Sequence, residues 1–374
     1  MTKSSESLVL QKAREILAQA ENLVHYLEEK GLPEPDFTSS SPPHPTGRDF
    51  DVIRNNLTEA AQDIILLANG PMHWLRTFFC YHHDLGAWQI ALRFGYFSIV
   101  PIDGSISVKE MAAVAKMDED RLGRVMKLLA SQRCFQELEE GVYAHTSLSA
   151  FIAKNKDIEA AIAFQADEMF EAASLTATSV QQDPYLSTPA HSAFNIRFGI
   201  SPYQWYAQNP ERGARFASAM AGLVQMNNDK LELRDRFPWA TLGSKTVVDV
   251  GGGSGHISIF LASQFPELEF IIIHNYNDET SVKIFKSFVP AMEKCSPDTS
   301  LLINDMLLPA ANTELKVEEH HLRQIDIAMM NGYAAKQRTL KEFTDLLKQA
   351  DERFEVVKVH GKGIMGLIEV QLRH

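Results

Sequence analysis

The stretch that most constrains this chain is Thr246–Ala262, with the sequence TVVDVGGGSGHISIFLA. A β-branched apolar run carries Asp249 near its end, and an apolar helical pattern closes the stretch. Between them lies a turn rich in glycine, with Gly251, Gly252, Gly253 and Gly255. Glycines let a backbone approach a ligand closely, and a helix start offers free N–H groups. This order therefore predicts a nucleotide-type cofactor site in a parallel-sheet domain, with a purely structural tight turn as the alternative.

Composition restricts the class of protein and its partners. A chain of 374 residues favours more than one domain, and 45% hydrophobic with 22% charged residues is typical of a soluble globular protein. The net charge of −12 argues against broad binding to nucleic acid or to anionic membranes. Cys80, Cys134 and Cys295 are widely spaced and form no CxxC pair. We therefore expect a reducing compartment and no metal site.

The N-terminal third is predicted to be helical and not to be a targeting segment. Charges run through the first 31 residues, and no apolar run approaches the ~18–20 residues of a membrane span, so a cytoplasmic location is expected. Helical spacing predicts a helix over roughly Ser7–Lys30, and Pro33–Gly47 is a Pro/Ser-rich linker. Further helical patterns cover Asp49–Asn69 and Trp74–Gly95. We expect this arm to be a packing element that can lie across a partner subunit.

The next segment has the order of a winged helix. Ser107–Glu110 is a capping box, Met111–Phe135 reads as helix, turn, helix, and Phe135–Ser149 reads as a short hairpin. DNA binding by such a unit requires a basic second helix on a basic domain. Basic residues are present at Arg121, Arg124, Lys127 and Arg133. Because the flanks and the whole chain are acidic, packing or dimerisation is the favoured role and nucleic-acid binding is not expected.

The C-terminal part alternates strands with helices. Residues 157–228 are expected to be mostly helical, and their aromatic side chains could form core or line an apolar substrate pocket. From Thr246 onward the apolar runs are TVVDV, EFIII, SLLINDMLL and FEVVKVHG, with a hairpin-like GIMGLIEVQL at the end. This alternation predicts a parallel or mixed α/β sheet.

The order of helical arm, winged helix, helical linker and glycine-loop sheet resembles S-adenosylmethionine-dependent O-methyltransferases, in particular those of fungal secondary metabolism. Four blocks carry the resemblance, and it extends over nearly the whole chain. They are VVDVGGGSGHISIFLASQFPEL, HNYNDETSVKIFKSFVPAM, SLLINDMLLP, and KQRTLKEFTDLLKQADERFEVVKVHG with the terminal LIEVQL. The resemblance implies a Rossmann-like methyltransferase domain after a mostly helical winged-helix dimerisation domain.

The same resemblance implies roles for individual residues. Asp249, Gly251, Gly253 and Gly255 match the positions that hold S-adenosylmethionine. His274 matches the general base, with a solvated loop histidine as the alternative. A phenol has a pKa near 10 and is a poor nucleophile at pH 7, so a neutral imidazole that takes its proton would promote attack on a methyl group. The implied partners are a hydroxylated polyketide or aromatic substrate and a second copy in a homodimer.

Two departures from the family pattern alter these expectations. The base motif has Asn275 where the family has Asp. The family also has a long segment before this motif, with the acid for the cofactor ribose, but here EFI runs directly into IIHNYNDE. Two parallel strands need a crossover of about a dozen residues, so EFIII must serve as one strand. Asp278 and Glu279 lie near the ribose-acid spacing but align just after the base, which leaves cofactor affinity doubtful.

Several functions and origins therefore stay open. A true deletion, a splicing error or an omitted segment would each give this sequence. Methyltransferase-fold pericyclases, which couple dehydration to Alder-ene or hetero-Diels–Alder cyclisation of polyketide-derived alkaloids, are an alternative to methyl transfer. For them His145, His274 and Lys336 are candidate catalytic groups, although His145 and Lys336 also fit structural roles. A non-catalytic dimer is the third possibility.

The predicted organisation has three segments. Residues 1–150 form the arm and the winged-helix dimerisation domain, and residues 151–240 form a helical linker with the substrate pocket. Residues 241–374 form the Rossmann-like methyltransferase domain, shortened between 270 and 274.

Overall fold

The computed structural model divides into two compact units that interleave along the sequence. It describes residues 7–185, 188–227, 229–243, 246–250, 256–265, 269–273, 278–296, 299–310, 313–361 and 365–373. Unit 1 comprises Met1–Glu171, Tyr206–Met226 and Leu315–Val317, and unit 2 comprises Ala172–Trp205, Asn227–Glu314 and Glu318–His374. The predicted three-segment division stays a prediction. Within the described ranges, no helix combines the length and the apolar character needed to cross a bilayer.

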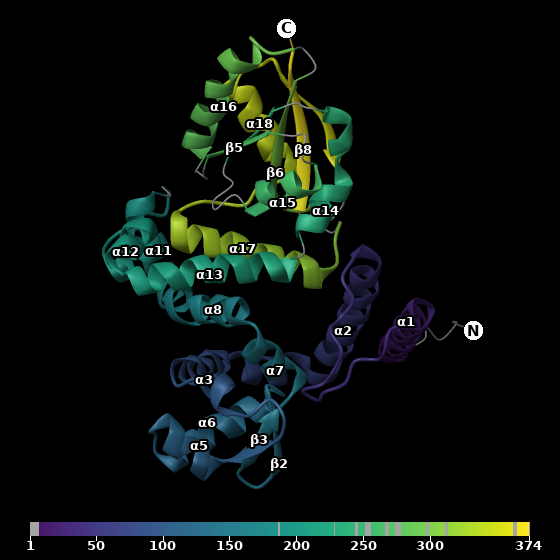
Figure 1. Ribbon diagram of the computed structural model, residues 1–374, viewed down its shortest axis with the longest axis vertical. Coiled ribbons are helices and arrows are strands. Elements are labelled where there is room, and N and C mark those ends of the chain that lie inside the picture. Colours follow the sequence, from purple (N-terminus) through teal and green to yellow (C-terminus); the bar gives the residue numbers. More distant parts are fainter. Residues whose placement is uncertain are drawn as a thin grey trace, which may run out of the picture. The chain divides into compact units, whose positions relative to one another are not determined.

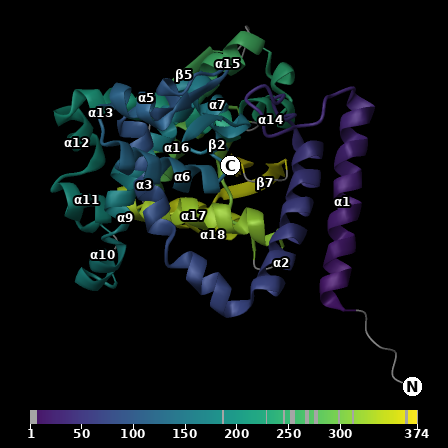
Figure 2. The same cartoon turned by 90° about the horizontal axis from the view of Figure 1, so that it is seen from below.

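The N-terminal arm of unit 1 consists of long helices. They are α1 (Leu8–Lys30), α2 (Arg48–Phe78) and α3 (Tyr81–Arg93). Helix α1 runs alongside α2 (Figure 2) and ends at Gly31, whose left-handed backbone closes the last turn. The expected interruption between Asn69 and Trp74 is confirmed: Gly70, directly before Pro71, has the non-helical dihedral angles φ 60° and ψ 177°, which divide α2 into two helical segments. A second break, at residues 79–80, separates α2 from α3 and interrupts the helix predicted over Trp74–Gly95.

The remainder of the N-terminal half follows the predicted order. Its elements are α4 (Tyr96–Ile99), β1 (Ser105–Ser107), α5 (Val108–Ala115), α6 (Glu119–Ser131), β2 (Phe135–Glu139), β3 (Val142–His145), α7 (Ser147–Lys154) and α8 (Lys156–Phe164). The three strands form an antiparallel sheet in the order β1-β3-β2. The capping box at Ser107, the helix–turn–helix and the hairpin are confirmed. His145 was expected from the sequence to follow the hairpin, but it is the last residue of β3.

Large apolar side chains hold this part of unit 1 together. Tyr96, Phe97, Phe135 and Tyr143 are fully buried, and the rings of Phe97 and Phe135 stack with centroids 5.4 Å apart. Each buried aromatic ring removes a large apolar surface from water, and close packing then restricts its neighbours to few rotamers. The core therefore fixes α3, α6 and the small sheet against one another.

The central part of the chain is mostly helical, as predicted. Its elements are a π-helix η1 (Gln165–Met169), α9 (Phe170–Ala173), α10 (Thr176–Gln182), a 3-10 helix η2 (Pro189–His191), α11 (Ala193–Phe198), α12 (Pro202–Gln208), α13 (Pro210–Asn227), α14 (Asp229–Arg236) and a 3-10 helix η3 (Trp239–Leu242). The π-helix is the irregular element, and such wide turns are frequently found at functional sites.

Unit 2 contains all five strands predicted after Thr246, in two sheets. The elements are β4 (Thr246–Val250), α15 (His256–Gln264), β5 (Glu269–Ile273), α16 (Asp278–Met292), β6 (Ser300–Met306), α17 (Lys316–Tyr333), α18 (Leu340–Ala350), β7 (Phe354–His360) and β8 (Met365–Leu372). Strands β4 and β5 pair in parallel, and β6, β8 and β7 form an antiparallel sheet in that order. EFIII is thus a single strand, as expected.

Helices cover both faces of the β6-β8-β7 sheet (Figure 1). On one face, α16 and α18 contribute Phe285 and Phe343 to a cluster that includes Ile368 of β8. On the other face, Leu233 of α14 and Leu261 of α15 pack with the neighbouring residue of β8, Leu367. Because successive strand residues point to opposite faces, one strand supplies both cores.

Candidate functional site

The candidate cofactor site is framed by β4, β5 and α15. Strand β4 ends at Val250 and α15 begins at His256, so the five residues of the glycine-rich segment separate strand from helix in the sequence. Asp249 lies in β4 opposite Ile272 of β5, and both strands end at the same edge of the sheet because they are parallel. The Asp249 side chain and Gly251, Gly252, Gly253 and Gly255 lie outside the described residues. The described backbone gives a strand followed, after five residues, by a helix, which is the order that suits a nucleotide-type cofactor.

The predicted base, His274, directly follows the last residue of β5. Residues 274–277 lie outside the described ranges, and α16 begins at Asp278. Four residues therefore connect the parallel strand to the next helix. His274 comes after the carboxyl end of β5, the edge that carries the glycine-rich turn of β4. Its catalytic role stays a prediction.

His145 is a buried histidine whose ring nitrogens both have partners. Its side chain is 3% exposed, with Nδ1 2.9 Å from Ser149 Oγ and Nε2 2.9 Å from the Val100 carbonyl oxygen. Burial lowers the pKa of His145 and so favours the neutral ring. These contacts favour the structural interpretation of His145 over the catalytic one.

Lys336 lies on the segment that leads into α18. Its ammonium is 3.0 Å from Glu342 Oε1, and its side chain is 44% exposed. Glu342 also completes the capping box with Thr339 at the start of α18. The contact favours the interpretation of Lys336 as a surface residue at a helix start.

Sequence reasoning missed two polar residues near the carboxyl end of β6, Asp305 and Arg338. Burial raises the pKa of Asp305, and this effect outweighs the opposing effects of the Met306 N–H and of the Arg338 charge. Arg338 is 5% exposed, and its backbone lies beside Leu307 in a parallel bridge. An acid near the end of an apolar strand was the available signal, because ligands of open α/β sheets bind at that edge. A carboxyl group with a raised pKa can donate a hydrogen bond to a ligand.

A second missed group lies at the end of α17. Asn331 is 4% exposed, and its side-chain oxygen accepts a 2.8 Å hydrogen bond from the Thr176 hydroxyl. Two residues on, the Tyr333 ring lies 5.8 Å from the Tyr203 ring, and burial raises the pKa of Tyr333. Tyr203 was among the aromatic residues expected to form core or a pocket, and it is 54% exposed. Aromatic rings beside a buried amide are typical of small-molecule pockets.

The π-helix of unit 1 carries a buried charge cluster that sequence reasoning also missed. Asp167 and Glu168 are 5% and 2% exposed. Arg215 donates to both carboxylates, while Arg93 and Arg212 bind Asp167 at 2.7 and 2.9 Å. Burial alone would raise the pKa of Asp167, but these hydrogen bonds hold it below its ordinary value. The available signal was two adjacent acids, one of which must face the interior of a predicted helix where a buried charge requires a partner.

Within the described ranges, no cluster of three His, Cys, Asp or Glu side chains could hold a metal ion. The cysteines are free thiols: Cys80 and Cys295 are exposed, whereas Cys134 is buried. Burial raises the pKa of the Cys134 thiol to about 12, which makes it a poor nucleophile.

Comparisons with curated proteins and with solved structures point to the same family. No family model matches the chain. The O-methyltransferase sol2 of Alternaria solani is 38% identical, and the alignment covers 96% of this chain and 94% of sol2. That alignment extends over 407 positions, whereas 96% of 374 residues is about 359, so the surplus positions are gaps in this chain. These gaps support the inference that this chain lacks a segment that its relatives contain.

Solved structures have the same fold. OxaC in complex with S-adenosylhomocysteine and oxaline has a TM-score of 0.76 and 17% identity, covering 98% of this chain and 99% of OxaC. The complex of LepI with S-adenosylmethionine has a TM-score of 0.71 and 15% identity, covering 96% of this chain and all of LepI. Together with the identity to sol2, these likenesses extend over nearly the whole chain. The chain therefore belongs to the family of fungal S-adenosylmethionine-dependent O-methyltransferases.

Proposed function

We propose that this protein transfers a methyl group from S-adenosylmethionine to a hydroxyl of a polyketide or aromatic small molecule. The observation that carries the proposal is the 38% identity to sol2 over nearly the whole length of both chains. The succession of β4 and α15 on either side of the glycine-rich segment supports it, since a strand followed closely by a helix start suits a nucleotide-type cofactor. When bound, the cofactor supplies an electrophilic methyl group.

Residues of this chain would bind the cofactor and accept the proton of the substrate. Gly251, Gly252, Gly253 and Gly255 would let the backbone approach the cofactor, with Asp249 setting the loop or reaching the ligand. His274 would accept the proton of the substrate hydroxyl at an imidazole nitrogen. A positioned general base contributes about 10²–10⁴-fold in rate, and holding the oxygen in line supplies much of the rest.

Calorimetric titration of the full chain with S-adenosylmethionine and S-adenosylhomocysteine tests the cofactor. Turnover is then measured with radiolabelled cofactor and a panel of phenols and polyhydroxynaphthalenes. We expect micromolar binding, and a kcat about 10²–10⁴-fold lower for His274→Ala. His320→Ala, which removes an exposed histidine of α17, is the matched control and should retain full activity. Full activity in His274→Ala would remove this residue from the site, and no cofactor binding by the folded chain would rule out methyl transfer.

Pericyclic chemistry on the same fold is the second candidate. The short connection between β5 and α16 favours it, because the family segment expected to carry the ribose acid has no room there. The likeness to a structure described as a pericyclic reaction enzyme, with a TM-score of 0.70, supports the same candidate at the level of the fold. A folded chain that binds no cofactor but cyclises a dehydrated polyketide alkaloid would establish it, whereas neither activity would leave a non-catalytic role.

We also propose that the protein forms a homodimer through unit 1. The elbow between α2 and α3 exposes a group of aromatic side chains, Trp74, Phe78, Phe79 and Tyr81, each between 47% and 63% exposed. Their rings contact one another, as in the stacked pair of Trp74 and Phe78 with centroids 5.2 Å apart. A contiguous apolar patch of this kind is typical of an interface.

A further inference from the structure

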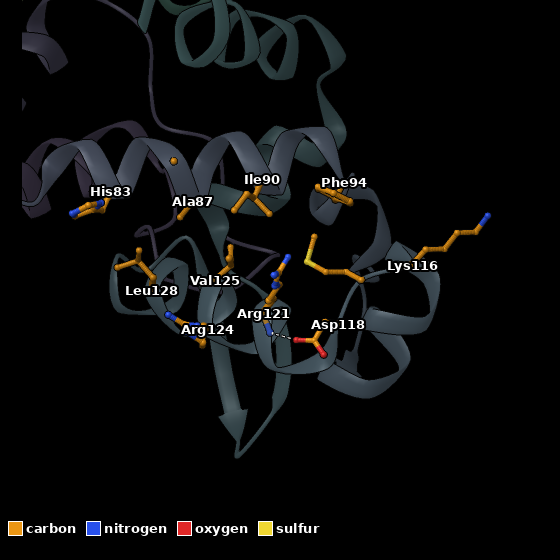
Figure 3. Close-up of a pocket in the computed structure, with 12 residues that line it drawn as sticks. His83, Ala87, Ile90, Phe94, Lys116, Asp118, Arg121, Arg124, Val125 and Leu128 are labelled. Atoms are coloured by element: carbon orange, nitrogen blue, oxygen red, sulfur yellow. Dashed lines mark hydrogen bonds between the residues drawn. The ribbon is translucent and has the colours of Figure 1, made fainter. Parts of the chain in front are cut away.

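Helices α3 and α6 of unit 1 enclose a groove of about 720 Å³ (Figure 3). Helix α3 contributes Ala87 and Ile90, with Phe94 just beyond its end, and α6 contributes Val125 and Leu128. Figure 3 shows these side chains pointing into the space between the two helices. The volume lies within the range of roughly 300–1,000 Å³ that is usual for small-molecule sites. The floor is therefore suited to an apolar body.

The rim of the groove is positively charged although the chain has a net charge of −12. Lys116, Arg121 and Arg124 line it. Arg124 has only a 4.0 Å contact with Asp120, and within the described part of the chain neither Lys116 nor Arg121 has an ion-pair partner. The acid in the lining, Asp118, accepts a hydrogen bond from the Arg121 N–H as the N-cap of α6. The uncompensated charge at the rim is cationic.

Lys116 has a backbone conformation that lysine rarely adopts. It caps α5 with φ 52° and ψ 46°, in the left-handed region where glycine is the usual residue. Strained residues of this kind persist when the structure overdetermines them, and they cluster at ligand clamps. The strain thus coincides with one of the two unpaired cations of the rim.

We propose that this groove binds an amphipathic organic acid. Its apolar body lies on the floor formed by Ile90, Phe94 and Val125, and its carboxylate faces Lys116 and Arg121. Charge complementarity selects an anion, while the apolar floor selects one with a hydrophobic body over an inorganic ion. The groove is formed by residues of unit 1, and the proposal does not depend on the proposed methyl transfer.

Calorimetry and fluorescence on the full chain test the proposal with pyrenebutyrate as the probe. Pyrenebutanol, which has the same apolar body and no charge, is the matched ligand. We expect saturable micromolar binding of pyrenebutyrate and binding of pyrenebutanol at least about fivefold weaker, since a charge contact at a partly solvated site contributes about that factor.

Four variants locate the binding. Arg121→Ala removes one cation, and Lys116→Gly removes the other while relaxing the strained backbone, so weaker binding cannot be attributed to misfolding. Each should weaken pyrenebutyrate binding about fivefold. Gly86→Leu should abolish binding, because a Cβ at Gly86 meets no atom within 4 Å and the side chain would fill the groove. Lys127→Ala, an exposed lysine of α6 outside the lining, is the control and should bind normally.

Three outcomes would overturn the proposal. Equal affinity for pyrenebutyrate and pyrenebutanol would show that the cations recognise nothing. Unchanged binding in all groove variants would place the probe elsewhere in the protein. Absent binding, with a dimer in sedimentation equilibrium that Gly86→Leu dissociates, would assign the groove to an interface between copies.

Discussion

The buried charge cluster on the π-helix gives the sharpest test of how unit 1 is held together. Arg215 donates to Asp167 at 2.7 Å and also to Glu168, and its own side chain is 22% exposed. In Arg215→Met, Asp167 keeps its contacts with Arg93 and Arg212. Glu168 keeps only a 3.6 Å contact with Arg212, so one carboxylate is stranded in the interior.

A stranded buried charge costs about 3–5 kcal/mol, and we expect this loss in the free energy of unfolding of Arg215→Met. Adding Glu168→Gln removes the stranded charge and should recover at least about 2 kcal/mol, which a double-mutant cycle measures as a coupling energy. Arg212→Met is the matched control. Its side chain is 40% exposed and Asp167 has two other arginines, so we expect a loss of at most about 1 kcal/mol.

Urea unfolding of the parent, Arg215→Met, Glu168→Gln, the double variant and Arg212→Met supplies these values. Circular dichroism and tryptophan fluorescence follow the unfolding, and their two transitions should coincide. A loss below about 1 kcal/mol, or a double variant as unstable as Arg215→Met, would refute the reasoning that Glu168 depends on Arg215.

Two further predictions concern packing and protonation. In Gly222→Ala the new Cβ would overlap the Asp157 carbonyl oxygen and come within 3.1 Å of Ala161 Cβ. We therefore expect the free energy of unfolding to fall by about 2 kcal/mol. In the control Gly86→Ala, whose Cβ meets no atom within 4 Å, it should rise by about 0.5–1 kcal/mol. Thermal unfolding compares them, and equal stability would contradict the close approach of α8 and α13. Because the pKa of Asp305 is raised in the folded protein, its charge lowers stability as the pH rises from about 4 through that pKa. Asp305→Asn should therefore be more stable than the parent at pH 7 and no more stable below about pH 4, and a parallel offset at every pH would contradict the assignment.

Local sequence signals predicted most of the elements. The capping box at Ser107 and the alternation after Thr246 gave helices and strands that the structure contains. These signals succeed because caps and hydrophobic periodicity act over a few residues. The interruption near Gly70 was predictable for the same reason, because the Gly70–Pro71 pair acts on its own backbone, whereas nothing as local marked the second break at residues 79–80.

Only part of the candidate site could be predicted from the sequence. The glycine-rich turn and His274 were identifiable because each follows directly from a strand. Asp305 and Arg338, and likewise Asn331 and Thr176, are far apart in sequence and come together only through tertiary packing. The contacts of His145 with Ser149 and Val100 likewise depend on how α7 and α4 pack beside β3.

The sequence by itself determined where a cofactor-type strand–turn–helix lies, that EFIII serves as one strand, and that the family is the O-methyltransferases. Only the tertiary structure decided which charges are buried together on the π-helix, that β8 serves two cores, and that an apolar groove in unit 1 is rimmed by unpaired cations. The physical reason is the separation along the sequence over which each interaction acts. Backbone propensity and capping are local, whereas burial, desolvation and charge pairing depend on residues that the chain brings together from distant positions.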